Sequence, residues 1–263
     1  MADTDSPSRN RLTRRGLLAG GAAALVGCAT GVPPQAIAGL RQISLVTAFD
    51  PTLTLRFYGV TGLDNELATG SLDLGLGSVA ADATRALLVP RFEVVSVEHR
   101  PQLLVERQRA HGLRSNLPDS ALTEALLAMP PRPAGDAVLL LASSWGQVPT
   151  TAVGAGNTAW YGSGLTQYAR GPNEEYNSAY ARVAWRTVLL RAADFAVIGR
   201  QDAWAPGRFV SAPWRKLTFR WAYANGASLP PAQVAELTEA ARAAVVESVP
   251  ETLTRLGLLA ART

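Results

Sequence analysis

A single cysteine, Cys28, stands at the end of the first apolar stretch of the chain, and this arrangement limits what the chain can fold into. With one cysteine among 263 residues, no intrachain disulfide can form, so a hydrophobic core has to stabilise the fold. The composition allows such a core, because 48% of the residues are hydrophobic and 17% are charged. The length suits one domain of ordinary size, and the sequence shows no internal repeat.

The first 27 residues have the organisation of a signal peptide. A polar beginning is followed by Arg14 and Arg15, and then by an apolar stretch rich in alanine and glycine that runs to Gly27. This stretch has about a dozen residues, whereas a membrane-spanning helix needs roughly 20. We therefore expect residues 1–27 to be an export signal that is removed. An uncleaved membrane anchor is the alternative.

The arginine pair lies in a segment, residues 13–18, that resembles the twin-arginine export motif. Leu17 stands in place of the usual aromatic residue and Ala19 in place of the usual lysine. The resemblance implies export of the folded protein, with Arg14 and Arg15 as the signal residues. An ordinary secretory signal that happens to contain two arginines is the alternative.

Residues 25–28 (Leu-Val-Gly-Cys) resemble the lipobox of bacterial lipoproteins, in which a small residue precedes the cleavage point and a thiol accepts diacylglycerol. The resemblance implies cleavage before Cys28 and lasting attachment to a membrane through lipid on its sulfur. Residues 28–40 are then the lipidated cysteine and a short tether, and residues 41–263 a single globular periplasmic domain. Ala29 after the cysteine resembles outer-membrane sorting in this class, so we expect the periplasmic side of the outer membrane rather than the inner.

Beyond the tether, the hydropathy pattern predicts both strands and helices. Predicted strands cover residues 42–49, 52–60, 91–97, 136–142, 158–169, 179–190 and 195–200. Predicted helices cover residues 74–89, about 119–130, a stretch from Pro230 and a last short helix from Pro250. The Asp50-Pro51 turn signal predicts a hairpin of the first two strands, and residues 100–117 fit either a helix or a lid-like excursion.

This order of elements predicts an α+β fold with a mixed, mainly antiparallel sheet and helices packed on one side. Over residues 42–258, the order resembles that of the periplasmic lipoproteins of the penicillin-binding-protein-activator and curli-secretion families. The resemblance is one of element order alone, so it implies a fold and no functional residue.

The residues that catalytic and metal sites require are scarce and scattered. The two histidines, His99 and His111, do not have the spacing of metal ligands, and the chain has no nucleophile elbow and no phosphate-binding loop. We therefore expect no metal, no cofactor and a non-enzymatic protein. A hydrolase that uses His99 or Asp64 with a second acid is the alternative, and Asp73 and Glu98 are further candidate acids.

The charge balance does not favour nucleic acid as a partner. Removal of residues 1–27 takes away four arginines and two aspartates, which lowers the formal net charge from +4 to +2. Lys216 is the sole lysine, and no long basic run remains.

A glycine-rich segment around Trp160 and Tyr161 is the first candidate interaction surface. Its glycines would let a peptide or a glycan approach the backbone closely, with Trp160, Tyr161 and Tyr168 as contacts. A bulged hairpin with core aromatics is the alternative.

The second candidate surface combines Trp204, Trp214 and Trp221 with arginines such as Arg215. Such mixtures are typical of protein interfaces and of membrane surfaces. Core tryptophans beside solvated arginines are the alternative. Taken together, these features predict an envelope lipoprotein, tethered through Cys28, that binds another envelope protein or a glycan.

Overall fold

The computed structural model divides the chain into two units, Met1–Gly31 and Val32–Thr263. All described residues belong to the second unit. They are residues 32–58, 66–97, 101–111, 117–128, 133–147, 159–168, 179–202, 204–205, 208–209, 214–221 and 228–260.

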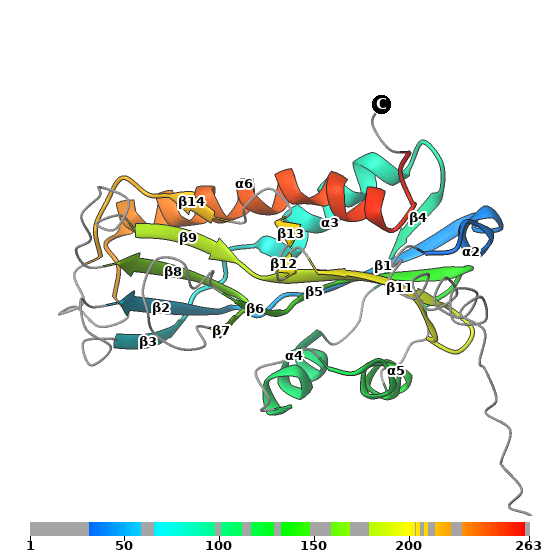
Figure 1. Ribbon diagram of the computed structural model, residues 1–263, viewed down its shortest axis with the longest axis horizontal. Helices are drawn as coiled ribbons and strands as arrows, with labels where there is room; N and C mark the ends of the chain where they lie inside the picture. Colours follow the sequence, from blue (N-terminus) through cyan, green and yellow to red (C-terminus); the bar gives the residue numbers. More distant parts are fainter. Residues whose placement is uncertain are drawn as a thin grey trace, which may run out of the picture. The chain divides into compact units, whose positions relative to one another are not determined.

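Two five-stranded sheets form the centre of the second unit (Figure 1). The first sheet has the order β11-β10-β5-β1-β4 and the second has the order β14-β9-β8-β2-β3. The strands of the first sheet are β1 (Gln42–Ala48), β4 (Glu93–Ser96), β5 (Ala137–Ser143), β10 (Trp185–Arg191) and β11 (Val197–Asp202). Those of the second are β2 (Thr52–Tyr58), β3 (Glu66–Ser71), β8 (Ser163–Tyr168), β9 (Ala179–Val183) and β14 (Trp214–Lys216).

The two sheets are connected by strands that continue from one into the other. The chain passes from β1 to β2 through residues 49–51, and from β9 to β10 through Ala184. The predicted hairpin of residues 42–49 and 52–60 is therefore wrong. Both edges of β1 already pair in parallel, with β4 and with β5, which leaves no edge for β2. Asp50-Pro51 marks a change of sheet and not a reversal of the chain.

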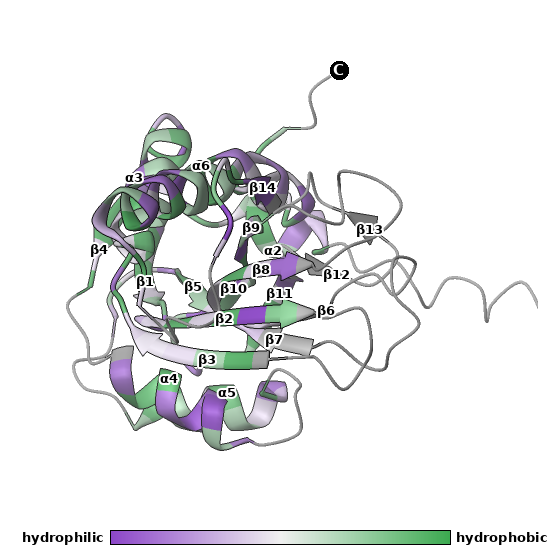
Figure 2. Cartoon of the chain, turned by 90° about the vertical axis from the view of Figure 1, so that its left-hand side faces the viewer, coloured by the Kyte–Doolittle hydropathy of each residue, from purple (hydrophilic) through white to green (hydrophobic). Residues whose placement is uncertain are grey.

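The helices lie on both sides of the first sheet (Figure 2). Helices α3 and α6 pack on one face, and α4 and α5 pack on the other. The structure confirms the α+β class, and it adds a second helical layer to the one-sided packing that was expected. The helices are α2 (Pro34–Ala38), α3 (Leu76–Leu88), α4 (Pro101–Ala110), α5 (Asp119–Leu127) and α6 (Pro231–Arg255).

Strand β5 explains why two helical layers are needed. All seven of its residues are buried, and alternate side chains enter different hydrophobic clusters. Leu139 and Leu141 pack toward α3 and α6, whereas Val138 and Leu140 pack toward α4 and α5. A strand that is apolar on both faces has to be covered on both faces.

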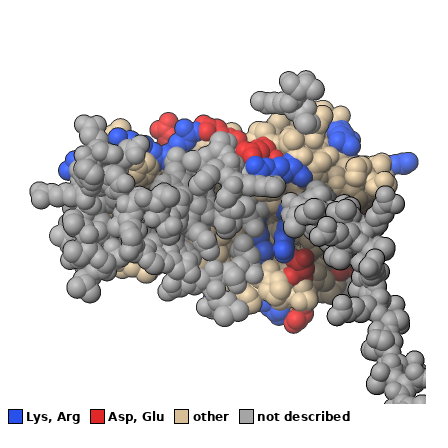
Figure 3. Space-filling view, in the orientation of Figure 1, with Lys and Arg blue, Asp and Glu red and all other residues tan. Residues whose placement is uncertain are grey.

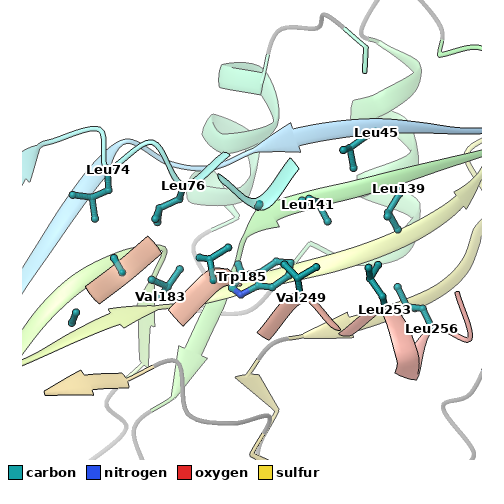
Figure 4. Packing of buried hydrophobic residues seen from close by; sticks show 14 of the residues in the cluster. Leu45, Leu74, Leu76, Leu139, Leu141, Val183, Trp185, Val249, Leu253 and Leu256 are labelled. Carbon is teal, nitrogen blue, oxygen red and sulfur yellow. The ribbon is translucent and has the colours of Figure 1, made fainter. Parts of the chain in front are cut away.

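The larger cluster centres on Trp185, which has no exposed surface. Figure 4 shows its ring between the strands and Val249 of α6. The indole Nε1–H donates to Ser248 Oγ at 3.1 Å, so the polar atom of this side chain is satisfied in the core.

Helix α6 runs without a break through Pro250, where the sequence analysis expected a new helix to start. Proline removes one backbone donor from the helix, but Val245, Val249 and Leu253 are all buried along one face. Their common burial against the sheet outweighs the lost hydrogen bond and keeps both halves in one helix.

Helix α2 lies in the segment that was expected to be a tether. Ile37 of α2 is 4% exposed, and both Ile37 and Val32 pack against the larger cluster. Among the residues expected to form the tether, Val32 and Ile37 therefore pack with the folded unit Val32–Thr263.

Candidate functional site

Between β5 and β8 in the chain, β6 (Trp145–Gln147) and β7 (Ala159–Tyr161) pair as a small antiparallel hairpin. Three backbone hydrogen bonds close its base. The N–H of Ser144 donates to the Ala184 carbonyl at 3.0 Å, and the N–H of Ala184 donates to the Gly162 carbonyl at 2.8 Å. The N–H of Gly162 donates to the Ser144 carbonyl at 3.1 Å, and the φ of Gly162 is +67°, which favours glycine.

Next to the foot of this hairpin, the buried Asp50 forms an ion pair with the half-exposed Arg109. The side chain of Asp50 is 1% exposed and that of Arg109 is 46% exposed. Arg109 Nε donates to Asp50 Oδ2 at 2.6 Å, while its Nη2 donates to Asp50 Oδ1 and to Thr52 Oγ1. This hydrogen bonding to Asp50 raises the pKa of the Arg109 guanidinium, against the opposing effect of partial burial.

The backbone around Asp50 completes the site. The N–H of Asp50 donates to Ser143 Oγ at 2.9 Å, and the N–H of Thr52 donates to Asp50 Oδ1 at 2.7 Å. The aspartate thus fixes the bend between β1 and β2 to the end of β5.

A second arginine, Arg186 of β10, is 2% exposed and is also held by α4. Its Nη2 donates to Gln108 Oε1 at 3.2 Å, and the same oxygen accepts from the Leu117 N–H at 3.0 Å. Two consecutive residues of α4, Gln108 and Arg109, therefore contact the two long strands that cross between the sheets.

Tyr161, the last residue of the hairpin, lies close enough to Asp50, Arg109 and Arg186 for their charges to act on its hydroxyl. Its ring lies 5.6 Å from that of Trp145, centroid to centroid, at an interplanar angle of 47°. Burial, and then the charge of Asp50, raises the pKa of the Tyr161 hydroxyl above its ordinary value, so the group stays protonated at neutral pH.

The arrangement of Asp50 and Arg109 is better suited to holding the backbone in place than to transferring a proton. Both oxygens of Asp50 already accept hydrogen bonds from Arg109, so this acid is poorly placed to take a proton from a substrate. The cluster holds the bend between β1 and β2, and Gly162 at the base of the hairpin lies against this bend. Hairpins held in this way are suited to binding.

Two residues of the first candidate surface fall on this hairpin, whereas Tyr168 is the last residue of β8. Trp160 and Tyr161 belong to β7, and β12 (Trp204–Ala205), which pairs with β13 (Arg208–Phe209), packs beside β6. The strands that carry Trp160, Tyr161 and Trp204 are thus neighbours. Tyr161 is half-buried, and the side chains of Trp160, Trp204 and Tyr168 lie outside the described part.

Of the tryptophans in the second candidate surface, Trp221 is the one whose side chain is described. Trp221 is 3% exposed and belongs to the core, so it is not a surface residue. Trp214, whose side chain lies outside the described part, and Arg215 belong to the edge strand β14. Arg215 Nη2 forms an ion pair with Glu247 Oε2 of α6. Figure 3 shows both acidic and basic side chains along the upper side of the molecule, where Figure 1 places this helix.

The other candidates divide into two groups. Cys28, Arg14, Arg15, His99, Asp64 and Glu98 lie outside the described residues. Asp73 is described, and its Oδ1 accepts from the N–H of Gly75 at 2.8 Å ahead of α3, which is a local turn contact.

The described residues provide neither a cluster of metal ligands nor a membrane-spanning helix. These residues contain no group of three or more histidine, cysteine or acidic side chains that could hold a metal ion. Among their helices, none is both long and apolar enough to cross a bilayer.

Asp50, Arg109 and Arg186 were not among the site residues that the sequence predicted. Asp50 was noted only as part of a turn signal. Arg109 lies in residues 100–117, which the sequence did not assign to a helix or to a lid-like excursion. Arg186 lies within a predicted strand, and nothing in the pattern marked it as buried. The pairing of these residues depends on contacts across 59 to 78 positions in the chain.

No protein-family model matches this chain, and no curated protein matches it. Among solved structures, the PelC dodecamer from Paraburkholderia phytofirmans is 10% identical, with a TM-score of 0.25 over 84% of this chain and 90% of that one. A PelC variant from the same organism is 8% identical, with a TM-score of 0.20 over 79% and 88% of the two chains. Similarity at this level assigns the chain to no family.

Proposed function

We propose that this chain is an exported lipoprotein of the cell envelope that is tethered through lipid on Cys28 and binds another envelope component without catalysing a reaction. One observation carries the proposal. The lipobox-like residues 25–28 stand directly ahead of the second unit, in which Val32, the first described residue, packs against the core. A signal that ends where a folded domain begins is the arrangement that a tethered protein needs.

The binding role draws support from the hairpin base. Asp50 and Arg109 lie beside the base of the hairpin that carries Tyr161, and both carboxylate oxygens of Asp50 already accept hydrogen bonds from Arg109. The component that it binds is a protein or a glycan of the periplasmic side, and the outer membrane is the favoured location of the tether.

Lipidation is tested by expressing the full chain in a bacterial host that is fed a fatty acid carrying a chemical handle. Wild type should incorporate the handle and be found in the membrane fraction. Cys28→Ala should do neither while it keeps its fold. A paired Arg14→Lys and Arg15→Lys variant separates the export route from lipidation, because it should block export only if the twin-arginine route is used. Unlabelled wild type that retains its initiator methionine in the cytosol would contradict the proposal.

Partner binding is tested with a photo-crosslinking residue at position 160 of the lipidated protein in intact cells. Glu239, exposed on α6, provides the matched control position. The proposal predicts a discrete adduct from position 160 and none from position 239. Equal labelling from both positions, or none from either, would count against a binding role for the hairpin.

A further inference from the structure

Only three residues separate Cys28 from Val32, the first described residue, which packs against the larger cluster. Four steps of fully extended chain reach about 14 Å at most. A lipid on Cys28 would therefore hold Val32 within about 14 Å of the bilayer surface, if that cysteine is modified as proposed above. The place of Val32 in the fold then decides which part of the domain faces the membrane.

Val32 lies at one end of the first sheet, beside the last turn of α6. A side chain at Gly199 of β11 would meet both Val32 and Leu256, and one at Gly257 would meet Ile37 of α2. These contacts place α2 and the segment that follows α6 on one end of the domain.

The turn between α3 and β4 belongs to the same end. Arg91 Nη1 donates to the carbonyl of Leu258 at 3.3 Å, next to the Gly257 that packs on Ile37. This turn exposes an apolar side chain, Val89, which is 56% exposed, together with Arg91. Arg41, at the start of β1, is exposed as well.

The opposite end of the domain lies far from this attachment. Gly199 pairs with Leu189, and Tyr180 stands nine residues earlier on the continuous β9–β10 path, which is about 30 Å at 3.3 Å per residue. Tyr180 aligns across the second sheet, through Thr166 and Arg56, with Leu67 of the edge strand β3. Leu67 is thus remote from Val32 both along the strands and across them.

The geometry points to a membrane-docking end, defined as α2, Arg41, the Val89–Arg91 turn and residues 256–260, which rests on an envelope bilayer while the second sheet points away from it. The inference rests on the proposed lipidation of Cys28. Exposed arginines beside an apolar side chain fit a bilayer interface, because arginine can reach phosphate groups while its stem and the apolar neighbour lie at the acyl boundary. Strand β3 would then face the periplasm, and the base of the hairpin, at the junction of the two sheets, would lie between the two ends.

The chain offers a matched pair of positions for the test. Val89 and Leu67 are apolar and exposed to the same degree, 56% and 55%, at opposite ends of the domain. Lipid occupies the sulfur of Cys28 in the lipidated protein, so Val89→Cys or Leu67→Cys would add the only free thiol. Gln35→Cys, on the exposed side of α2, serves as a positive control close to the tether.

Each lipidated variant is labelled with an environment-sensitive fluorophore and reconstituted into phosphatidylcholine vesicles that contain a spin-labelled lipid. The spin label should lower the fluorescence at position 89 about two-fold, and that at position 67 much less. Equal quenching at the two positions, or stronger quenching at position 67, would overturn the docking end.

Intact mass measured on the same samples separates the two proposals. Lipid mass on Cys28 together with equal quenching refutes the docking end and leaves the lipoprotein assignment standing. Absence of lipid mass from protein made in an export-competent host refutes the lipoprotein assignment itself.

Discussion

At the scale of single residues, Asp50 is a charge that the fold has removed from water and neutralised with one partner. Arg109→Ala would leave this carboxylate buried without its guanidinium, and removal of one partner of a buried pair is strongly destabilising. Arg109 itself is 46% exposed, so solvent screens part of the interaction. We expect the free energy of unfolding to fall by about 2 kcal/mol, measured by urea denaturation.

Arg107→Ala is the matched control for this loss. Arg107 stands on the same helix, its side chain is 47% exposed, and its ion pair with Glu124 spans 3.4 Å with both partners exposed. Exposed pairs of this kind contribute between about 0 and 1 kcal/mol. If both substitutions lower the free energy of unfolding equally, the ion pair of Asp50 stabilises the fold no more than an exposed pair does.

Asp136 should make the stability of the fold sensitive to acid. Its carboxylate accepts hydrogen bonds from the backbone N–H groups of Gln42 and Arg41, which lowers its pKa in the folded state. Because the pKa of Asp136 is lower in the folded than in the unfolded protein, its carboxylate stabilises the fold at pH values above the unfolded pKa of about 4. This stabilisation is lost as the pH falls through the pKa of the folded protein. Urea midpoints between about pH 5 and pH 2.5 should therefore fall less steeply in Asp136→Asn than in wild type. If the urea midpoints of the two proteins fall equally steeply with pH, Asp136 does not contribute to acid sensitivity in this way.

At the scale of the elements, the close approach of β2 and β8 depends on Gly164. A Cβ at this position would overlap the Thr54 carbonyl oxygen of the neighbouring strand, so Gly164→Ala has to push the two strands apart. Strain of this kind costs about 1–3 kcal/mol. We expect a loss in that range in urea denaturation, with the largest rise in amide exchange in the second sheet.

Gly77→Ala is the control within α3. The nearest atom to a Cβ there is Thr47 Oγ1 at 3.6 Å, which is an ordinary contact. Alanine is favoured over glycine in a helix by about 0.5–1 kcal/mol, so this variant should be as stable as wild type or slightly more stable. A destabilised Gly77→Ala beside a neutral Gly164→Ala would reverse the expected order and contradict the strand geometry.

At the scale of the whole molecule, the domain should need the segment that looks like a tether. A protein that starts at Val32 keeps Ile37 against the larger cluster, whereas one that starts at Arg41 loses Val32 and the buried Ile37. Deletion of a large buried aliphatic side chain costs about 2–5 kcal/mol. The shorter protein should therefore unfold at a clearly lower urea concentration. Equal urea midpoints of the two proteins would show that residues 32–40 do not stabilise the domain.

Much of the secondary structure could be predicted because it follows from local patterns. Strand β5 is a continuous apolar run, and α3 and the start of α6 show helical spacing of their apolar residues. Strand β3 was missed, since it contains a glycine and few apolar residues and depends on pairing with β2. Pro250 was given too much weight, because the burial that keeps α6 continuous is a tertiary effect.

By itself, the sequence determined the α+β class, the positions of most elements and the expectation of a lipid tether at Cys28. These features follow from hydropathy and from short motifs, which neighbouring residues define. Only the tertiary structure decided that β1 passes into a second sheet, that Arg109 meets Asp50 and that Trp221 is buried. These outcomes depend on which distant segments share an edge or a face, and strands that are apolar on both sides do not specify their neighbours.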